Sequence, residues 1–206
     1  VILISYLLGS IPTGAIAGRL RGVDLRSEGS GNLGATNALR VLGPRVGVPV
    51  LIVDVAKGAL AVLVVARLGG SEPLLGTSGV RLAAGLAAMA GHVWPVFAGF
   101  RGGKGVATAC GVFLAMAPLA TAASVAAFVI LVLATRYVSV GSIGAVILLP
   151  FTIAAEATGR GEPRPTALIV TAALVAAAVV ALHRANVKRL VAGNENRFAF
   201  KKREES

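Results

Sequence analysis

Long runs of Ala, Val, Leu and Ile, separated by short polar clusters, are the feature that most constrains the fold of this chain. Most of these runs approach the ~20 residues with which an α-helix crosses a hydrocarbon core about 30 Å thick. Only 14% of the 206 residues are charged and the mean hydropathy is +0.83, whereas a soluble domain carries about 25% charged residues. The runs lack the alternation of a barrel strand. We therefore predict an all-α integral membrane protein that forms one polytopic domain over residues 1–206.

The positions of Lys and Arg predict how the helices are oriented. The apolar runs predict spans at 1–17, 46–66, 81–96, 143–157 and 166–182. The longest run, 106–135 with Pro118 near its middle, crosses either once as a tilted helix or twice as two short helices that turn near 117–120. Only two crossings put both Arg136 and the basic tail on the inner side, where Lys and Arg accumulate. We expect about seven transmembrane helices, with an external amino terminus, a cytoplasmic carboxyl terminus and external loops at 69–79 and 158–165.

The formal net charge of +11 does not indicate a nucleic-acid-binding protein. Aromatic residues make up 5% of the chain and do not alternate with the basic residues, most of which lie beside spans and contact anionic headgroups. Cys110, the single cysteine, lies in an apolar run and is interpreted as a packing residue. Two histidines and unclustered carboxylates form a poor ligand set, so we expect neither a metal nor a cofactor.

The segment from Gly29 to Asn37, followed by Arg40, is polar and lies between two apolar runs. It contains three glycines, two hydroxyls and two carboxamides but no carboxylate. A turning backbone of this composition can direct N–H groups and neutral side-chain donors at an anion without repelling it. We interpret this segment, called the cradle below, as a phosphate-binding loop. An ordinary surface loop rich in Gly, Ser and Asn is the alternative.

Further polar clusters follow spans on the same predicted side of the membrane. The sequence from Arg101 to Gly105 combines glycine N–H groups, two cations and a helix amino terminus, which suits a phosphate, but it lacks the spacing of a nucleotide P-loop. His92 and Trp94 precede it as either site residues or an ordinary histidine and an interfacial aromatic at the end of a span. The hydroxyls of Ser139 and Ser142 either cap the helix that follows or complete the anion site.

Two pairs of polar residues lie in or beside the predicted spans. Asp54 and Lys57 are three residues apart, so they share a helical face and turn inward as a neutralising pair. Either this pairing is purely structural, or one of the two residues also orients the polar loops. His183 and Asn186 share a face at the end of the last span if the helix continues, and we interpret them as part of a site rather than of a basic amphipathic tail.

These segments resemble, in the same order and over nearly the whole chain, the cytoplasmic motifs of the PlsY family of bacterial acyl-phosphate:glycerol-3-phosphate acyltransferases. The resembling segments are 24–37, 91–105 and 183–195, together with Asp54, Lys57 and the sequence Arg136-Tyr-Val-Ser139. The resemblance implies transfer of a fatty acyl group from acyl phosphate to the sn-1 hydroxyl of glycerol 3-phosphate. The products would be lysophosphatidic acid and phosphate, in the first acylation of bacterial phospholipid synthesis. We expect a monomer in the inner (plasma) membrane, in contact with membrane lipid and with its site at the cytoplasmic face.

The resemblance also implies a role for each cluster. The implied catalytic residues are Ser30, Asn32, Asn37, His183 and Asn186. The implied substrate-binding residues are Gly31, Thr36, Arg40, Arg101, Gly102, Gly103, Lys104, Ser139 and Ser142, and the implied structural residues are Asp54, Lys57 and Glu195. The cradle would hold the phosphate of the acyl donor. Glycerol 3-phosphate would be held by Arg40, Lys104, Ser139, Ser142, His183 and Asn186, and Glu195 would fix the tail.

The sequence leaves the proton acceptor and two other classes of protein open. His183 is a possible base, but nearby cations favour its neutral form, and the resemblance suggests that a phosphate oxygen of a substrate takes the proton instead. Neither histidine belongs to a His-x-x-x-x-Asp dyad, because Phe97 and Lys188 stand at the positions where the Asp would be. A small transporter of phosphate esters is the main alternative, although the chain has no internal repeat and its polar clusters lie at span ends. A structural membrane subunit would leave these clusters unexplained.

Overall fold

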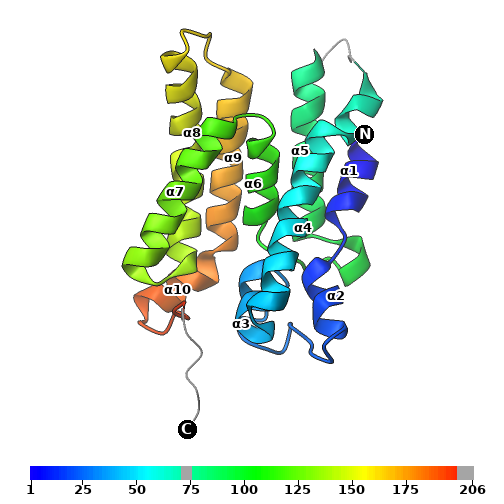
Figure 1. Ribbon diagram of the computed structural model, residues 1–206, viewed down its shortest axis with the longest axis vertical. Helices are drawn as coiled ribbons and strands as arrows, with labels where there is room; N and C mark the ends of the chain where they lie inside the picture. Colours follow the sequence, from blue (N-terminus) through cyan, green and yellow to red (C-terminus); the bar gives the residue numbers. More distant parts are fainter. Residues whose placement is uncertain (71–75, 199–206) are drawn as a thin grey trace. The chain divides into compact units, whose positions relative to one another are not determined.

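The structure, a computed structural model, describes residues 1–70 and 76–198, and within these residues all regular structure is helical (Figure 1). The α-helices are α1 Ile2–Gly9, α2 Thr13–Arg19, α3 Ala35–Leu42, α4 Pro44–Leu63, α5 Gly76–Val93, α6 Val106–Leu114, α7 Pro118–Thr135, α8 Val138–Gly159, α9 Thr166–Leu182 and α10 Arg184–Val191. Two short 3₁₀ helices are η1 Val65–Gly69 and η2 Val96–Ala98. The prediction of an all-α membrane protein is therefore confirmed.

Five helical segments of the described chain are long and apolar enough to cross a membrane. They are Ile2–Arg19, Pro44–Gly69, Gly76–Ala98, Pro118–Thr135 and Val138–Gly159. The pair α9 and α10, bent by 55° at its break, would be a sixth span if it crosses as one unit. The number of seven spans and the orientation of the termini stay predictions.

The longest apolar run, residues 106–135, is not one helix. α6 ends at Leu114, and α7 begins at Pro118, whose missing N–H costs nothing at the first position of a helix. The run therefore contains two helices, with the turn a few residues earlier than expected, and the prediction that it crosses the membrane twice stays a prediction. α6 has only 9 residues, or roughly 14 Å of helix, which is too short to cross a bilayer alone.

The chain divides into two compact units, residues 1–121 and residues 122–206, and each is described by itself. In the first unit, α4 packs against α1, α2, α3, α5 and α6, and α1 lies along α5 (Figure 1). Glycine allows the closest of these approaches: a Cβ at Gly58 of α4 would collide with the carbonyl oxygen of Thr108, and one at Gly111 of α6 with that of Val55. Small residues let membrane helices approach in this way.

The first predicted span, 1–17, is broken in its middle. α1 ends at Gly9 and α2 begins at Thr13, with Pro12 at the N-cap of α2. Proline cannot donate a backbone hydrogen bond, so the helix stops there. The carbonyl oxygen of Ile11 lies in this break and accepts the N–H of Thr13 at 3.0 Å as well as a bond from Lys57 at 3.3 Å, so the break contributes residues to the candidate site.

In the second unit, α8 packs against α9, and α10 contacts α9. The structure corrects two predicted loops, one at the start of α8 in this unit and one at the start of α5. Ser139 and Ser142 lie in the first turns of α8 rather than in a loop, because the helix begins already at Val138. The predicted external loop 69–79 is partly helical, since η1 includes Gly69 and α5 starts at Gly76, while residues 71–75 lie outside the described chain.

Candidate active site

The cradle is the loop that joins α2 to α3, and Asn37 of α3 holds it from beneath. The Asn37 side chain is 1% exposed, and its Nδ2 donates to the carbonyl oxygens of Leu25 (3.1 Å) and Glu28 (3.0 Å). Its Oδ1 accepts the backbone N–H of Ser30 at 2.8 Å. Both ends of the Asn37 carboxamide are thus bonded inside the loop, which makes Asn37 a support of the cradle.

The cradle uses three of its own N–H groups internally, so the expectation that its backbone directs N–H groups at an anion fails at these three positions. The N–H of Gly31 donates to Glu28, and that of Gly34 to Oδ1 of Asn32 at 2.8 Å. Together with the Ser30 N–H, these bonds rigidify the loop and are not available to a ligand. Side chains are further donors that suit an anion, among which Ser30 is half-buried and Thr36 exposed.

The sequence from Arg101 to Lys104 forms a turn between η2 and α6 that is built on the end of α5. The Gly102 N–H donates to Val93, and the Gly103 N–H donates to the carbonyl oxygen of His92, each at 3.1 Å. These two glycines therefore shape the turn rather than bind a phosphate with their own N–H groups. Arg101 is exposed and Lys104 half-buried.

The structure brings the cradle and this turn together within the first unit. Asn32 donates through Nδ2 to the carbonyl oxygen of Gly102 at 3.4 Å. Arg26, just before the cradle, donates to the carbonyl oxygen of Ala98 in η2. Arg40 lies exposed in the last turn of α3. Two of the polar clusters predicted from sequence thus lie side by side.

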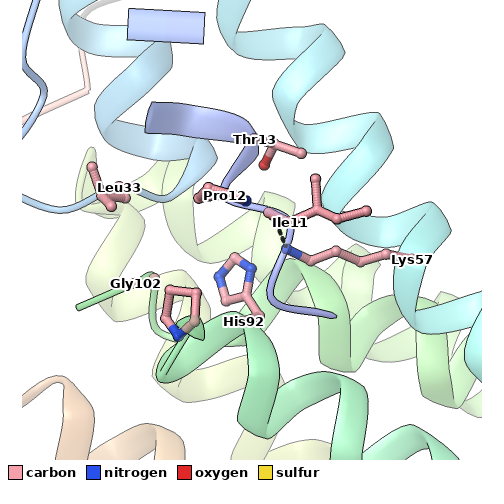
Figure 2. Close-up of a pocket in the computed structure, with 9 residues that line it drawn as sticks. Ile11, Pro12, Thr13, Leu33, Lys57, His92 and Gly102 are labelled. Atoms are coloured by element: carbon pink, nitrogen blue, oxygen red, sulfur yellow. Dashed lines mark hydrogen bonds between the residues drawn. The ribbon is translucent and has the colours of Figure 1, made fainter. Parts of the chain in front are cut away.

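A buried polar network centres on Asp54, and Figure 2 draws three of its other members, Thr13, Lys57 and His92. Oδ1 of Asp54 accepts a hydrogen bond from Thr13 Oγ1 at 2.6 Å and lies 2.9 Å from Nζ of Lys57 and 3.5 Å from Nδ1 of His92. Lys57 also donates to the carbonyl oxygen of Ile11 at 3.3 Å, across the break between α1 and α2. The predicted pairing of Asp54 with Lys57 is confirmed, but the pair has further partners.

His92 and Thr13 are the members of this network that sequence reasoning did not assign to the site. They line a small pocket with Leu33, Lys57 and the Gly102–Gly103 turn, which Figure 2 shows around the His92 ring. The signal for His92 was its place in a segment that resembles a family motif, directly after Gly91. Thr13 carries no such signal, because a threonine at a helix start is commonplace.

In the second unit, the carboxylate of Glu195 accepts hydrogen bonds from three side chains. Its Oε1 accepts bonds from Ser139 Oγ (3.0 Å) and Asn186 Nδ2 (2.6 Å), and its Oε2 accepts the Nε–H of Arg189 at 2.7 Å. Burial alone would raise the pKa of the Glu195 carboxyl, but the bonds from Asn186, Arg189 and Ser139 and the charge of Arg189 outweigh it, so the pKa lies below its ordinary value. Ser139 therefore joins the tail to α8, and the alternative that Ser139 caps this helix is wrong, because no side chain caps α8.

His183 and Asn186 do not continue one straight helix. α9 ends at Leu182, and His183 stands at the bend before α10. Its ring is 3% exposed, and Nδ1 contacts the carbonyl oxygen of Val179 at 2.8 Å. A carbonyl oxygen only accepts, so Nδ1 carries the proton in this contact, and in the neutral ring Nε2 is then the acceptor nitrogen. Ser142 is buried on α8, three residues after Ser139.

The bonds to Glu195 predict a pH dependence of the tail. Because the folded pKa of Glu195 is lowered, its contribution to stability is complete above about 4.5, the ordinary value, and is lost as the pH falls through the lower folded pKa. The variant Glu195→Gln should be less stable than the parent at pH 7 and should lack this part of the acid dependence. Thermal unfolding in detergent, measured between pH 7 and about pH 3, tests it.

A matched control for that measurement is Glu162→Gln, which changes an exposed carboxylate at the loop before α9. The control should unfold with the pH dependence of the parent. If Glu195→Gln keeps the full acid dependence of the parent, the three bonds to its carboxylate do not stabilise the folded tail.

Helical segments long enough to cross a membrane, together with polar clusters at their ends, define a multi-pass integral membrane protein with a candidate anion site. The chain belongs to the glycerol-3-phosphate acyltransferase family, whose model matches residues 1–193. Glycerol-3-phosphate acyltransferases of Trichlorobacter lovleyi and Geobacter sulfurreducens are similar to it. The first is 47% identical, over 94% of this chain and 94% of the relative, and the second is 46% identical, over 95% and 94%.

Two solved structures are also similar, both of PlsY, an integral membrane glycerol 3-phosphate acyltransferase. Its glycerol 3-phosphate form is 39% identical with a TM-score of 0.84 and covers 96% of this chain and 94% of that one. Its lysophosphatidic acid form is 38% identical with a TM-score of 0.81, over 96% and 93%. The resemblance stated from sequence is confirmed. Family membership favours an acyltransferase over the transporter and the structural subunit that the sequence left open.

Proposed function

We propose that this chain transfers a fatty acyl group from acyl phosphate to the sn-1 hydroxyl of glycerol 3-phosphate, at the cytoplasmic face of the bacterial inner membrane. The observation that carries the proposal is the contact between the cradle and the Gly102–Gly103 turn through Asn32. Because of this contact the two loops lie side by side, which supports a site where each loop binds one phosphorylated substrate. Family membership supports the acceptor, since a related protein was solved as its glycerol 3-phosphate form and its lysophosphatidic acid form.

The reaction needs positioning and charge stabilisation more than a strong base. The hydroxyl oxygen of glycerol 3-phosphate attacks the acyl carbonyl carbon, and the bond from that carbon to the phosphate oxygen breaks. The hydroxyl proton passes to a phosphate oxygen of a substrate, and inorganic phosphate leaves. Acyl phosphate is a reactive mixed anhydride, so oriented donors and cations can supply most of the rate enhancement.

The proposed roles divide between the clusters. Ser30, Asn32 and Thr36, with Gly31 in the loop and Asn37 beneath it, hold the phosphate of the acyl donor. Arg40, Arg101 and Lys104 in the first unit bind glycerol 3-phosphate, with the Gly102–Gly103 turn shaping their pocket. In the second unit, Ser139, Ser142, His183 and Asn186 are the residues that the family resemblance assigns to glycerol 3-phosphate, and Glu195 fixes the tail. The protein acts as a single-domain monomer without a cofactor.

The acyl donor is the part of the proposal that a direct comparison tests. Purified protein in detergent is given glycerol 3-phosphate with either palmitoyl phosphate or palmitoyl-coenzyme A, and lysophosphatidic acid is measured. We expect product only from palmitoyl phosphate, because the cradle is a short, rigid loop suited to a small leaving group. Product from the thioester at a comparable rate would overturn the choice of donor while leaving the acyltransferase intact.

Lys104→Ala should mainly raise the KM for glycerol 3-phosphate and leave the KM for palmitoyl phosphate close to that of the parent. The reason is that a lost cation removes binding to one phosphate, a contribution of about 1.5–3 kcal/mol or roughly 10- to 100-fold. Steady-state kinetics with each substrate varied in turn measures the split. Arg21→Ala, which removes an exposed cation from the loop before the cradle, is the control and should change neither KM. A change in the donor KM alone would reverse the two phosphate assignments.

A further inference from the structure

Asp54 has more partners than a structural ion pair requires. It is 0% exposed, and groups from three segments converge on its Oδ1: Thr13 at the start of α2, Lys57 on α4 and His92 on α5. Its Oδ2 is buried and accepts no hydrogen bond from the part of the chain that the structure describes. A carboxylate placed only for stability would have both oxygens satisfied, and a buried ion pair is in any case weak evidence for stability.

His92 connects this carboxylate to the turn at the candidate site. One ring nitrogen, Nδ1, faces Asp54 at 3.5 Å. The other, Nε2, lies so close to Gly103 that a Cβ there would collide with it. The backbone of His92 also supports the turn, because its carbonyl oxygen accepts the Gly103 N–H at 3.1 Å. The turn therefore rests on both the side chain and the main chain of His92.

The Gly102–Lys104 turn carries groups that are proposed to bind substrate. Gly102 accepts the bond from Asn32 of the cradle, and Lys104 follows Gly103 directly. A rotation of the His92 ring would shift Gly103 and with it the position of the Lys104 backbone. Displacements of about 1 Å at a substrate-positioning group can cost on the order of 100-fold in rate.

We propose that Asp54 is a positioning residue of the acyltransferase, which orients His92 and so fixes the Gly102–Lys104 turn against which glycerol 3-phosphate binds. Thr13 and Lys57 hold the carboxylate in place from the helix break and from α4. The inference rests on the proposed function, because it assigns the turn to the acceptor substrate. It goes beyond the mutual pairing of Asp54 with Lys57, which would serve stability alone.

The test distinguishes a positioning role of Asp54 from simple pairing with Lys57 by removing both charges together. Asp54→Asn alone leaves the Lys57 ammonium buried without its counter-ion, and that variant is expected to fold poorly. The double variant Asp54→Asn with Lys57→Met removes both charges. It should recover thermal stability close to the parent while its KM for glycerol 3-phosphate stays raised by about tenfold or more, with the KM for palmitoyl phosphate little changed.

A second variant keeps the ion pair and breaks only the link to the turn. In His92→Gln the side-chain amide can reach toward Gly103, but the nitrogen that faces Asp54 is lost. The same selective rise in the KM for glycerol 3-phosphate is expected, and this variant decides the question if the double variant does not fold. Ser124→Ala is the control, because it removes a partly buried hydrogen bond, 3.2 Å to Thr152, between two other helices.

The outcomes are distinct. The inference is overturned if the folded double variant or His92→Gln has the kinetics of the parent. It is also overturned if both KM values rise equally, or if Ser124→Ala shows the same change, because either result indicates a general loosening of the protein. A parent protein without acyl transfer would contradict the proposed function instead. The inference holds only when an active parent and a folded variant differ selectively in the KM for glycerol 3-phosphate.

Discussion

Gly103→Ala is expected to lower kcat/KM for glycerol 3-phosphate on the order of 100-fold or more. A Cβ at residue 103 would overlap Nε2 of His92, whose ring is confined on its other side by Asp54. The ring cannot retreat without breaking that contact, so the turn itself must move. Kinetics of the purified variant, with thermal unfolding measured alongside, test the prediction.

Gly159→Ala is the matched control. Its Cβ would meet no atom within 4 Å, and Gly159 ends α8. The control should keep the activity and stability of the parent, since an exposed Gly→Ala change at a compatible position is neutral or slightly stabilising. Full activity of Gly103→Ala would show that the turn is soft and that His92 does not fix it.

Asn37→Leu is expected to abolish most activity, with kcat/KM reduced on the order of 100-fold, while the helices persist. Leucine has nearly the shape of asparagine but leaves three groups without their partner: the carbonyl oxygens of Leu25 and Glu28 and the N–H of Ser30. A buried group left unpaired costs about 1–3 kcal/mol; the bond to Leu25 is buried and the other two are partly buried, so the loop rearranges to reach water. Both KM values are then expected to rise, because the cradle also contacts the Gly102 turn.

Ser27→Ala tests whether any lost bond in this loop has the same effect. Ser27 donates to Asp24 at 2.9 Å on the exposed side of the loop. A water molecule can replace that bond, and the variant should remain active. If Ser27→Ala and Asn37→Leu lose activity equally, Asn37 is not the specific support of the cradle.

The apolar runs predicted most of the fold, because about 20 consecutive apolar residues have few alternatives to a membrane helix. The predicted helix boundaries were wrong where local composition and tertiary context disagree. Gly76-Thr-Ser-Gly79 has the composition of a loop but forms the first turn of α5. Ser139 was expected in a polar loop before the helix, as a cap or as part of the anion site, but it lies in α8 and its hydroxyl bonds to Glu195. Contacts over 56 residues of separation have no local signature.

The sequence predicted which clusters of polar residues form the candidate site, but not which hydrogen bonds these residues make. The absence of carboxylates marked the cradle as anion-binding, yet no pattern shows that Ser30, Gly31 and Gly34 donate their N–H groups inside the loop. The spacing of Asp54 and Lys57 predicted their pairing. The approach of His92 from another helix depends on packing, which a single sequence does not encode locally.

The most direct test of the account is phosphate release by the purified protein given palmitoyl phosphate with and without glycerol 3-phosphate, with lysophosphatidic acid measured in the same samples. For an acyltransferase of this kind, we expect that release requires both substrates and equals the lysophosphatidic acid formed. Release without glycerol 3-phosphate at the same rate, or no release by folded protein with both substrates, would contradict an acyl transfer between two phosphorylated substrates.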